Sequence, residues 1–274
     1  MGAVMNPEIP LNSADSPRII AIANQKGGVG KTTTAINLAT ALAAIRKRVL
    51  LIDLDPQGNA STGLGIARSA REVDSYHLLS GGTTPLEAAQ KTEIPGLEVI
   101  PAGSDLAGAE IELVNEEQRE YCLREALEAG ATGFDFILID CPPALGLLTI
   151  NALVASQAVL VPLQCEFFAL EGVSHLIKTI ERVKRAFNPG LEIQGIVLTM
   201  FDRRNNLSGM VAQDVREHFG DKVYNTVIPR NVRVSEAPSH GRPVLVYDMK
   251  CTGSQAYLNL ASEVIRRERL VEAA

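Results

Sequence analysis

Short hydrophobic runs, separated by longer mixed stretches, are the main pattern of this 274-residue chain. The runs are rich in Val, Ile and Leu, which is typical of strands that are buried on both faces of a sheet. Helical stretches separate most of the runs, as they do in parallel sheets with helical crossovers. The pattern predicts an α/β fold with a mostly parallel, twisted β-sheet and helices on both faces. The predicted strands are residues 19–23, 49–52, 97–100, 134–139, 158–161, 193–198, 223–228 and 244–247.

The chain before the first predicted strand has a different character. Residues 1–17 contain three prolines among Asn, Ser and Asp, a composition that predicts a disordered tail. Residues 18–274 show neither internal repeats nor a second linker, so we expect them to form a single domain. Because the sequence contains no apolar run near 18 residues, we expect a cytoplasmic protein.

Charge is unevenly distributed along the chain. The formal net charge is −6, which by itself argues against a nucleic-acid partner. Residues 71–135 carry 4 basic and 14 acidic side chains, whereas residues 178–250 carry 12 basic and 8 acidic ones. The acidic chain can therefore still present one basic face, although a scattered solvated surface explains the counts equally well.

Composition also limits the chemistry of the protein. Aromatic residues make up only 4% of the chain and Trp is absent, which disfavours a stacking surface for single-stranded nucleic acid. The four cysteines lack C-x-x-C spacing, so buried thiols are favoured over a zinc site or disulfides. They are Cys122, Cys141, Cys165 and Cys251.

A glycine-rich segment lies between the first predicted strand and a helix predicted from about Thr32 to Arg46. It ends like a phosphate-binding loop, G-x-x-x-x-G-K-[ST], but Gln25 occupies the first glycine position and Lys26 adds a second lysine. Backbone N–H groups of such a loop, together with the start of the helix, bind phosphates. The hydroxyl of Thr32 is the expected Mg²⁺ ligand. The predicted nucleotide contacts are Lys26, Gly27, Gly28, Val29, Gly30, Lys31, Thr32 and Thr33.

Aspartates follow two other predicted strands. Asp53 and Asp55 are two residues apart where the run 49–52 ends, and Asp140 closes the run 134–139 before two prolines. Ligands of parallel sheets bind beyond the carboxyl ends of the strands, so all three carboxylates are expected near the phosphates. One aspartate can serve the metal shell and another can orient a water molecule, and Asp140 fits a Walker-B aspartate.

These three motifs together resemble the ParA/MinD group of P-loop ATPases, in which a lysine at the position of Lys26 marks a deviant Walker A loop. Within the group, residues 23–38, 53–59 and 227–241 are most similar to chromosomal ParA (Soj) partition ATPases. The resemblance extends from Arg18 over nearly all of the chain. It implies a cytoplasmic, nucleoid-associated ATPase that binds ATP or ADP with Mg²⁺ and acts in chromosome partition.

The resemblance also implies a mechanism. ATP binding closes two subunits face to face, Lys26 reaches the partner's phosphates, and Lys31 and Asp55 act in hydrolysis, with Asp55 positioning the water. Thr32, Asp53 and Asp140 serve the metal. The ATP-bound homodimer binds double-stranded DNA without sequence preference. A ParB-type centromere-binding partner stimulates hydrolysis and thereby releases the dimer.

Arginines in the basic segment, residues 178–250, are the candidates for DNA contacts. Arg203, Arg204, Arg230 and Arg233 cluster in two short segments, and Arg204 and Arg233 match positions that family members use for DNA. Surface ion pairs are the alternative for each arginine. Arg230 also lies in a turn that resembles the family's adenine-side loop, so the nucleotide is a second possible partner. The adenine-side candidates are Met200, Asp202, Pro229, Arg230 and Asn231.

Other members of the family suggest alternative functions. A ParA-like positioner of protein cargo would use the same ATPase. A MinD-like regulator of division would need a C-terminal membrane helix, but residues 263–274 are charged and lack aromatics, so stable membrane binding is not expected. An iron–sulfur role, as in nitrogenase iron proteins, is disfavoured because the cysteines lack the sequence pattern that surrounds the cysteines of those proteins. A tail of 17 residues is too short for a helix-turn-helix extension.

Overall fold

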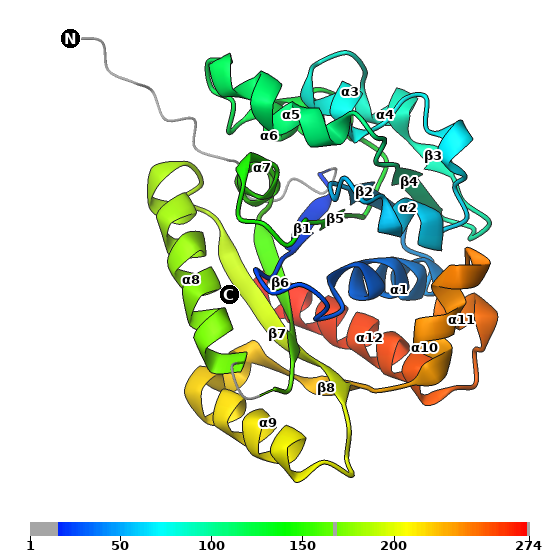
Figure 1. Ribbon diagram of the computed structural model, residues 1–274, viewed down its shortest axis with the longest axis vertical. Coiled ribbons are helices and arrows are strands. Elements are labelled where there is room, and N and C mark those ends of the chain that lie inside the picture. The colour runs from blue at the N-terminus through cyan, green and yellow to red at the C-terminus, as the bar shows by residue number, and fades with distance from the viewer. Residues whose placement is uncertain (1–15, 167–168, 273–274) are drawn as a thin grey trace.

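The computed structural model describes residues 16–166 and 169–272, and within them one eight-stranded sheet lies between two layers of helices (Figure 1). The predicted tail, residues 1–17, falls almost wholly outside the described residues. The strand order is β3-β4-β2-β5-β1-β6-β7-β8. All neighbouring strands are parallel except β3 and β4, which are antiparallel. The predicted fold class is therefore confirmed.

The strands agree with seven of the eight predicted runs. The sheet comprises β1 (Arg18–Ile22), β2 (Val49–Asp53), β3 (Gln90–Lys91), β4 (Leu97–Ile100), β5 (Phe136–Asp140), β6 (Ala158–Gln164), β7 (Glu192–Phe201) and β8 (Val223–Pro229). The short edge strand β3 was not predicted, because two polar residues, one partly buried and one exposed, carry no hydrophobic pattern.

The helices form the two outer layers. Residues on one face of the sheet pack with α3 (Ser75–Leu79), α5 (Leu106–Glu112), α6 (Cys122–Gly130), α7 (Leu147–Ala155), α8 (Ala169–Ala186) and α9 (Asn206–Phe219). The opposite face packs with α1 (Lys31–Ala44), α11 (Val244–Tyr247) and α12 (Thr252–Glu272). The remaining short helices are α2 (Asn59–Gly63), α4 (Pro85–Ala88) and α10 (Val232–Glu236).

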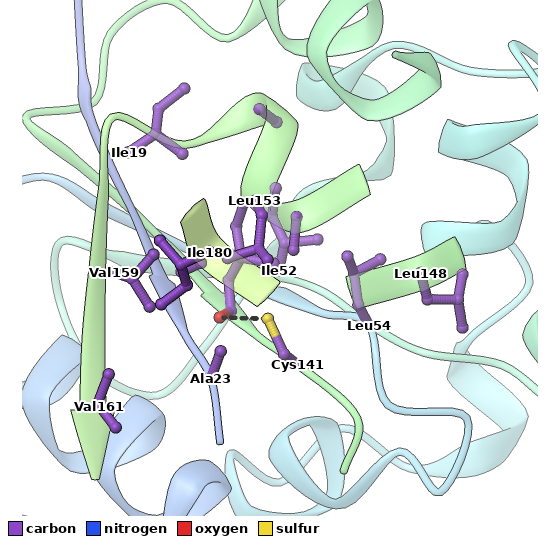
Figure 2. Close-up of a cluster of buried hydrophobic side chains, with 14 of the residues drawn as sticks. Ile19, Ala23, Ile52, Leu54, Cys141, Leu148, Leu153, Val159, Val161 and Ile180 are labelled. Atoms are coloured by element: carbon purple, nitrogen blue, oxygen red, sulfur yellow. Dashed lines mark hydrogen bonds between the residues drawn. The ribbon is translucent and has the colours of Figure 1, made fainter. Parts of the chain in front are cut away.

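Alternation along the central strands decides which side chains face which layer. Ile52, Leu54 and Cys141 belong to the core on the α7 side of the sheet, where Figure 2 shows them among other apolar side chains. Since successive side chains of a strand point to opposite faces, Asp53 and Asp140 point to the other side, where α1 lies. The apolar pattern of the strands therefore places both aspartates on the face of the phosphate-binding loop.

The predicted strand at residues 244–247 is wrong. These residues form the short helix α11, which begins after Pro243. Its first N–H donates to Asn37 Oδ1 of α1 at 2.8 Å, and its carbonyl at Val244 accepts from Ser254 Oγ of α12 at 3.1 Å. A run of four apolar residues has no periodicity that separates strand from helix, and here the contacts with α1 and α12 decide the conformation.

The last helix is an integral part of the core. Leu260, Ala261 and Val264 of α12 are fully buried against the α1 side of the sheet. Glu263, on the same helix, accepts hydrogen bonds from the backbone N–H groups of Asn225 and Thr226 of β8, both at 2.9 Å. Among the described residues, no helix is both long enough and apolar enough to cross a membrane.

Candidate nucleotide-binding site

The phosphate-binding loop connects β1 to α1 at the carboxyl edge of the sheet. Gly28 and Gly30 have φ angles of 74° and 88°, in the left-handed region that glycine adopts without strain. A Cβ added to Gly27 or Gly28 would meet no atom within 4 Å. The loop thus presents exposed backbone around open space at the positive end of α1, an arrangement suited to phosphate groups.

The two lysines of the loop are held differently. Lys31 is only 7% exposed, and its Nζ donates to the carbonyl of Lys26 at 3.2 Å. Burial lowers the pKa of Lys31, while the nearby Asp140 acts in the opposite direction. Lys26 instead extends along the surface to Glu166, with Nζ and Oε2 2.5 Å apart and both side chains almost half exposed. Glu166 was not predicted; only the fold brings it to the loop.

Asp53 and Asp140 are paired across neighbouring strands β2 and β5 and are fully buried. Asp53 already has several donors: Ser61 N and Ser61 Oγ at 2.8 and 2.7 Å, and Asp55 N at 3.2 Å. Both carboxylate oxygens of Asp140 lack a hydrogen-bond partner among the described residues. An unpartnered buried carboxylate is costly unless it has a ligand.

The electrostatics of the Asp53–Asp140 pair also favour a ligand at Asp140. Burial, followed by the charge of Asp53, raises the pKa of Asp140 well above its usual range. Burial likewise raises the pKa of Asp53, although its hydrogen bonds to Ser61 act against the rise. The hydroxyl of Thr32 lies near Asp140 and opposes the rise, but its geometry falls short of a hydrogen bond. A cation beside Thr32 and Asp140 would relieve this repulsion.

This chemistry suits a metal that keeps phosphate and water ligands. Within the described part of the chain, no three His, Cys, Asp or Glu side chains converge to form a protein-only metal site. Mg²⁺ is usually held by one or two carboxylates together with substrate phosphates and waters. Asp140 and Thr32 fit that role directly. The role of Asp53 at the metal stays a prediction, and the hydrogen bonds that its carboxylate accepts support the segment after β2.

We expect Asp140→Asn to stabilise the nucleotide-free, metal-free protein. A carboxyl group whose folded pKa exceeds its unfolded pKa makes stability fall as the pH rises from the unfolded value through the folded one. Asparagine carries no ionisable group, so this pH-dependent loss of stability disappears. The melting temperature should exceed that of the wild type by about 2 °C or more at pH 8, and the difference should shrink toward pH 4. Differential scanning calorimetry across this range measures both effects.

Asp53→Asn is the matched control for this prediction. Its new amide nitrogen would face at least one of the donors at Ser61 or Asp55, so a buried mismatch would offset the relief of charge. We expect a smaller gain than for Asp140→Asn, or a net loss. Equal gains for the two variants would contradict the assigned difference between the two carboxylates.

Asp55 lies just beyond the buried pair and is 8% exposed. Its Oδ1 accepts from the N–H of Gln57 at 3.0 Å, which fixes the carboxylate at the start of the turn. Arg71 supports the continuation of this turn: its guanidinium donates to the carbonyls of Gly58, Ala102 and Ile66 at 3.3, 3.1 and 2.8 Å. Arg71 was not predicted as a site residue. A lone arginine in an acidic segment carries no signal until the fold buries it.

The segments predicted for the adenine side and for DNA meet at the ends of β7 and β8. Phe201 of β7 is in register with Pro229 of β8, and Arg230 N donates to the Phe201 carbonyl at 3.0 Å. Met200 has a φ of 50° and lies next to the loop, with its Cε 3.8 Å from a Cβ placed on Gly30. The fold therefore brings the segment with Met200, Asp202, Arg203 and Arg204 to the segment with Pro229, Arg230 and Asn231, whereas Arg233 follows on α10.

Two of these arginines form ion pairs at the surface. Arg204 makes a two-pronged contact with Asp202, Nε to Oδ1 at 3.0 Å and Nη2 to Oδ2 at 2.9 Å, while its side chain stays 88% exposed. Hydrogen bonds from Arg204 lower the pKa of Asp202 to about 2. Arg233 contacts Glu236 at 3.0 Å and Asp248 at 3.6 Å. Exposed pairs of this kind contribute at most about 1 kcal/mol, so phosphates can compete for both guanidinium groups.

Fold and loop together define a P-loop ATPase of the deviant Walker A class, and comparisons with known proteins agree. Residues 17–193 match the AAA domain family. The chain is 67% identical to the chromosome partitioning protein ParA of Caulobacter vibrioides over 94% of its length and 97% of that protein. It is 55% identical to the sporulation initiation inhibitor protein Soj of Bacillus subtilis, over 90% of this chain and 98% of that one. The chain belongs to the ParA/Soj family of chromosome-partitioning ATPases.

A solved structure of a protein with a different named activity has the same fold. Cobyrinic acid a,c-diamide synthase from Mycobacterium smegmatis, with bound ADP and magnesium, is 38% identical and superposes with a TM-score of 0.80. The match covers 92% of this chain and 96% of the other. Since one fold can serve different tasks, the fold alone does not identify what the ATPase cycle of this chain drives.

Proposed function

We propose that this chain is a DNA-segregation switch. ATP closes two subunits into a dimer, the dimer binds double-stranded DNA without sequence preference, and hydrolysis stimulated by a ParB-type partner releases it. The observation that carries the proposal is Lys26: it is almost half exposed at the rim of the loop, and among the described residues its ammonium is held only by a surface ion pair. Such a pair contributes at most about 1 kcal/mol, so the lysine can exchange Glu166 for the phosphates of a second subunit.

Within one subunit, the loop and the aspartates divide the work on ATP. Exposed N–H groups of Gly27 and Gly28 and the ammonium of Lys31 would bind the phosphates, with Lys31 positioned by its bond to the Lys26 carbonyl. Mg²⁺, held by Thr32 and Asp140, would neutralise charge on the phosphates. Asp55, fixed by Gln57 N, would orient the attacking water. In the monomer the loop is open to solvent, and a facing subunit would exclude water from it.

The proposed DNA surface lies at the ends of β7 and β8. Arg203, Arg204 and Arg230 are exposed there, on segments joined by the Phe201–Pro229 register, and the exposed Arg233 follows on α10. Arginine contacts to phosphates position a protein on DNA without reading bases. A dimer would present this set of arginines twice, so its affinity should fall steeply with salt. Arg230 remains a candidate for the nucleotide as well.

Arg204→Glu and Arg233→Glu are each expected to weaken ATP-dependent DNA binding by about ten-fold or more at moderate salt. The reason is charge reversal at two symmetric places in the dimer. Arg182→Glu is the matched control, because Arg182 is also exposed but lies on α8. Filter binding or fluorescence anisotropy with a random-sequence duplex measures the effect. Unchanged affinity in both variants, with ATPase activity retained, would remove these arginines from the DNA surface.

The nucleotide dependence is the central test of the proposed function. DNA binding should be measured without nucleotide and with ADP, ATP and a non-hydrolysable ATP analogue, each across a salt series. We expect tight binding only with ATP or the analogue, and persistent binding with the analogue. Binding that is equally tight without nucleotide would refute the proposed switch.

A further inference from the structure

A groove outside the nucleotide site is lined by acidic and apolar residues. It encloses about 570 Å³ between α3 and α4 on one side and α5 and α6 on the other. These four helices lie together at the top of Figure 1. Four carboxylates line the groove, and its described lining contains no Lys, Arg or His. They are Glu112, Glu116, Glu117 and Glu125.

The floor and one flank of the groove are apolar. Leu78, Leu79 and Leu113 lie in its lining, and all three are at most 6% exposed. On the segment that forms one wall, but outside the lining of the groove, Ile111 and Val114 are 76% and 51% exposed. An apolar floor, an acidic rim and exposed aliphatic side chains beside it are together the features of a protein-binding groove.

The acidic charge of this region is not neutralised within the groove. Of the four carboxylates, Glu112 accepts from the hydroxyl of Tyr76 at 2.6 Å, and within the described residues none of them forms an ion pair with an arginine or lysine. The nearby Arg119 and Arg124 are paired with Glu120 and Glu128 instead. The surrounding segment, residues 71–135, carries 14 acidic and only 4 basic side chains. The occupant that this field favours is therefore cationic.

We propose that the groove between α3–α4 and α5–α6 binds a cationic, amphipathic peptide segment of a partner protein. Its Lys or Arg side chains would meet the four glutamates, and an apolar side chain would enter the groove above Leu78 and Leu113. Nucleic acid is excluded as occupant by the charge of the groove. The inference goes beyond the proposed DNA cycle and does not depend on it, because it concerns binding to a face that carries none of the arginines or loop residues.

The test uses a synthetic probe and the full-length chain. The probe is a fluorescein-labelled peptide of about 12 residues, three helical turns, made of lysine, leucine and alanine with the leucines on one face. A second peptide replaces the leucines with alanine. We expect saturable binding of the first peptide, at least ten-fold weaker binding of the second, and a several-fold loss of affinity between about 50 and about 200 mM salt.

Two variants locate the binding site. Glu116→Lys combined with Glu125→Lys should weaken binding at least ten-fold, whereas Glu171→Lys with Glu181→Lys, which makes the same charge change on exposed positions of α8, should not. Ala129→Trp fills the groove at an exposed lining position and should also weaken binding, without altering charge. Circular dichroism checks that each variant is folded. If the double variant Glu116→Lys with Glu125→Lys does not fold, Ala129→Trp still tests the site.

A thiol-labelling measurement gives the location independently. Cys122 lines the groove and is partly exposed, whereas Cys251 is partly exposed elsewhere. Bound peptide should slow iodoacetamide labelling of Cys122 and leave Cys251 unaffected, as read by mass spectrometry. The proposal is overturned if the amphipathic peptide does not bind saturably, if the double variant in the groove binds like the wild type, or if Cys122 is not protected.

Discussion

Replacing Asp55 with alanine is expected to lower the rate of ATP hydrolysis by about 100-fold or more while ATP binding and dimerisation persist. Asp55 lies beside the buried Asp53–Asp140 pair and is held by Gln57 N at 3.0 Å, so its carboxylate is positioned before substrate arrives. The phosphate contacts assigned to the loop and to Lys31 do not involve it. Steady-state phosphate release, measured together with nucleotide affinity, separates the two effects.

Two further variants sharpen this result. Asp55→Asn keeps an oxygen for the Gln57 N–H but removes the charge, so it should hydrolyse almost as slowly as the alanine variant. Asp221→Ala removes an exposed aspartate far along the chain, after α9, and should leave the rate unchanged. Normal turnover by Asp55→Ala would mean that another group orients the water.

Lys26→Ala is expected to abolish dimerisation at protein concentrations where the wild type dimerises with ATP, a loss of at least ten-fold in dimer affinity. Monomer affinity for ATP should change only a few-fold, because the ion pair that the Lys26 ammonium forms among the described residues is with Glu166, outside the loop. Folding stability should fall by less than about 1 kcal/mol, since the lost pair is at the surface. Sedimentation velocity with a non-hydrolysable analogue measures the dimer, and titration calorimetry measures the monomer.

The second lysine of the loop provides the contrast. Lys31 is buried and donates to the Lys26 carbonyl, so Lys31→Ala should lose ATP binding itself and with it every later step. Glu166→Gln removes the partner of Lys26 in the monomer without touching the lysine. If Lys26→Ala dimerises with the affinity of the wild type, the proposed contact across the dimer is wrong, whatever the behaviour of Lys31→Ala.

Much of the fold followed from local patterns. Seven of the strands were predicted because buried parallel strands are apolar on both faces, a signal that a single sequence carries. The positions of the loop and of the three aspartates also followed, because motifs at strand ends of a parallel sheet must meet at one edge. The run at residues 244–247 shows where this reasoning fails: its helical form depends on Asn37 and Ser254, which are distant in sequence.

The state of each functional side chain depended on contacts between distant segments. Asp53 and Asp140 are both strand-end aspartates in the sequence. Within the described part of the chain, only Asp53 accepts hydrogen bonds from α2 and the turn before it, and the oxygens of Asp140 have no donor. Arg71 and Glu166 became visible as neighbours of the site only after folding, since the first is 13 residues from Gly58 and the second is 140 residues from Lys26.

The residue order alone thus specified the sheet, the phosphate loop and the family, because hydrophobic periodicity and a glycine–lysine motif act over a few neighbouring residues. The three-dimensional arrangement determined which carboxylate is free, which lysine is exposed and where the acidic groove lies. These properties arise from burial and from pairing between segments that are far apart in the chain, and such interactions leave no local pattern to recognise.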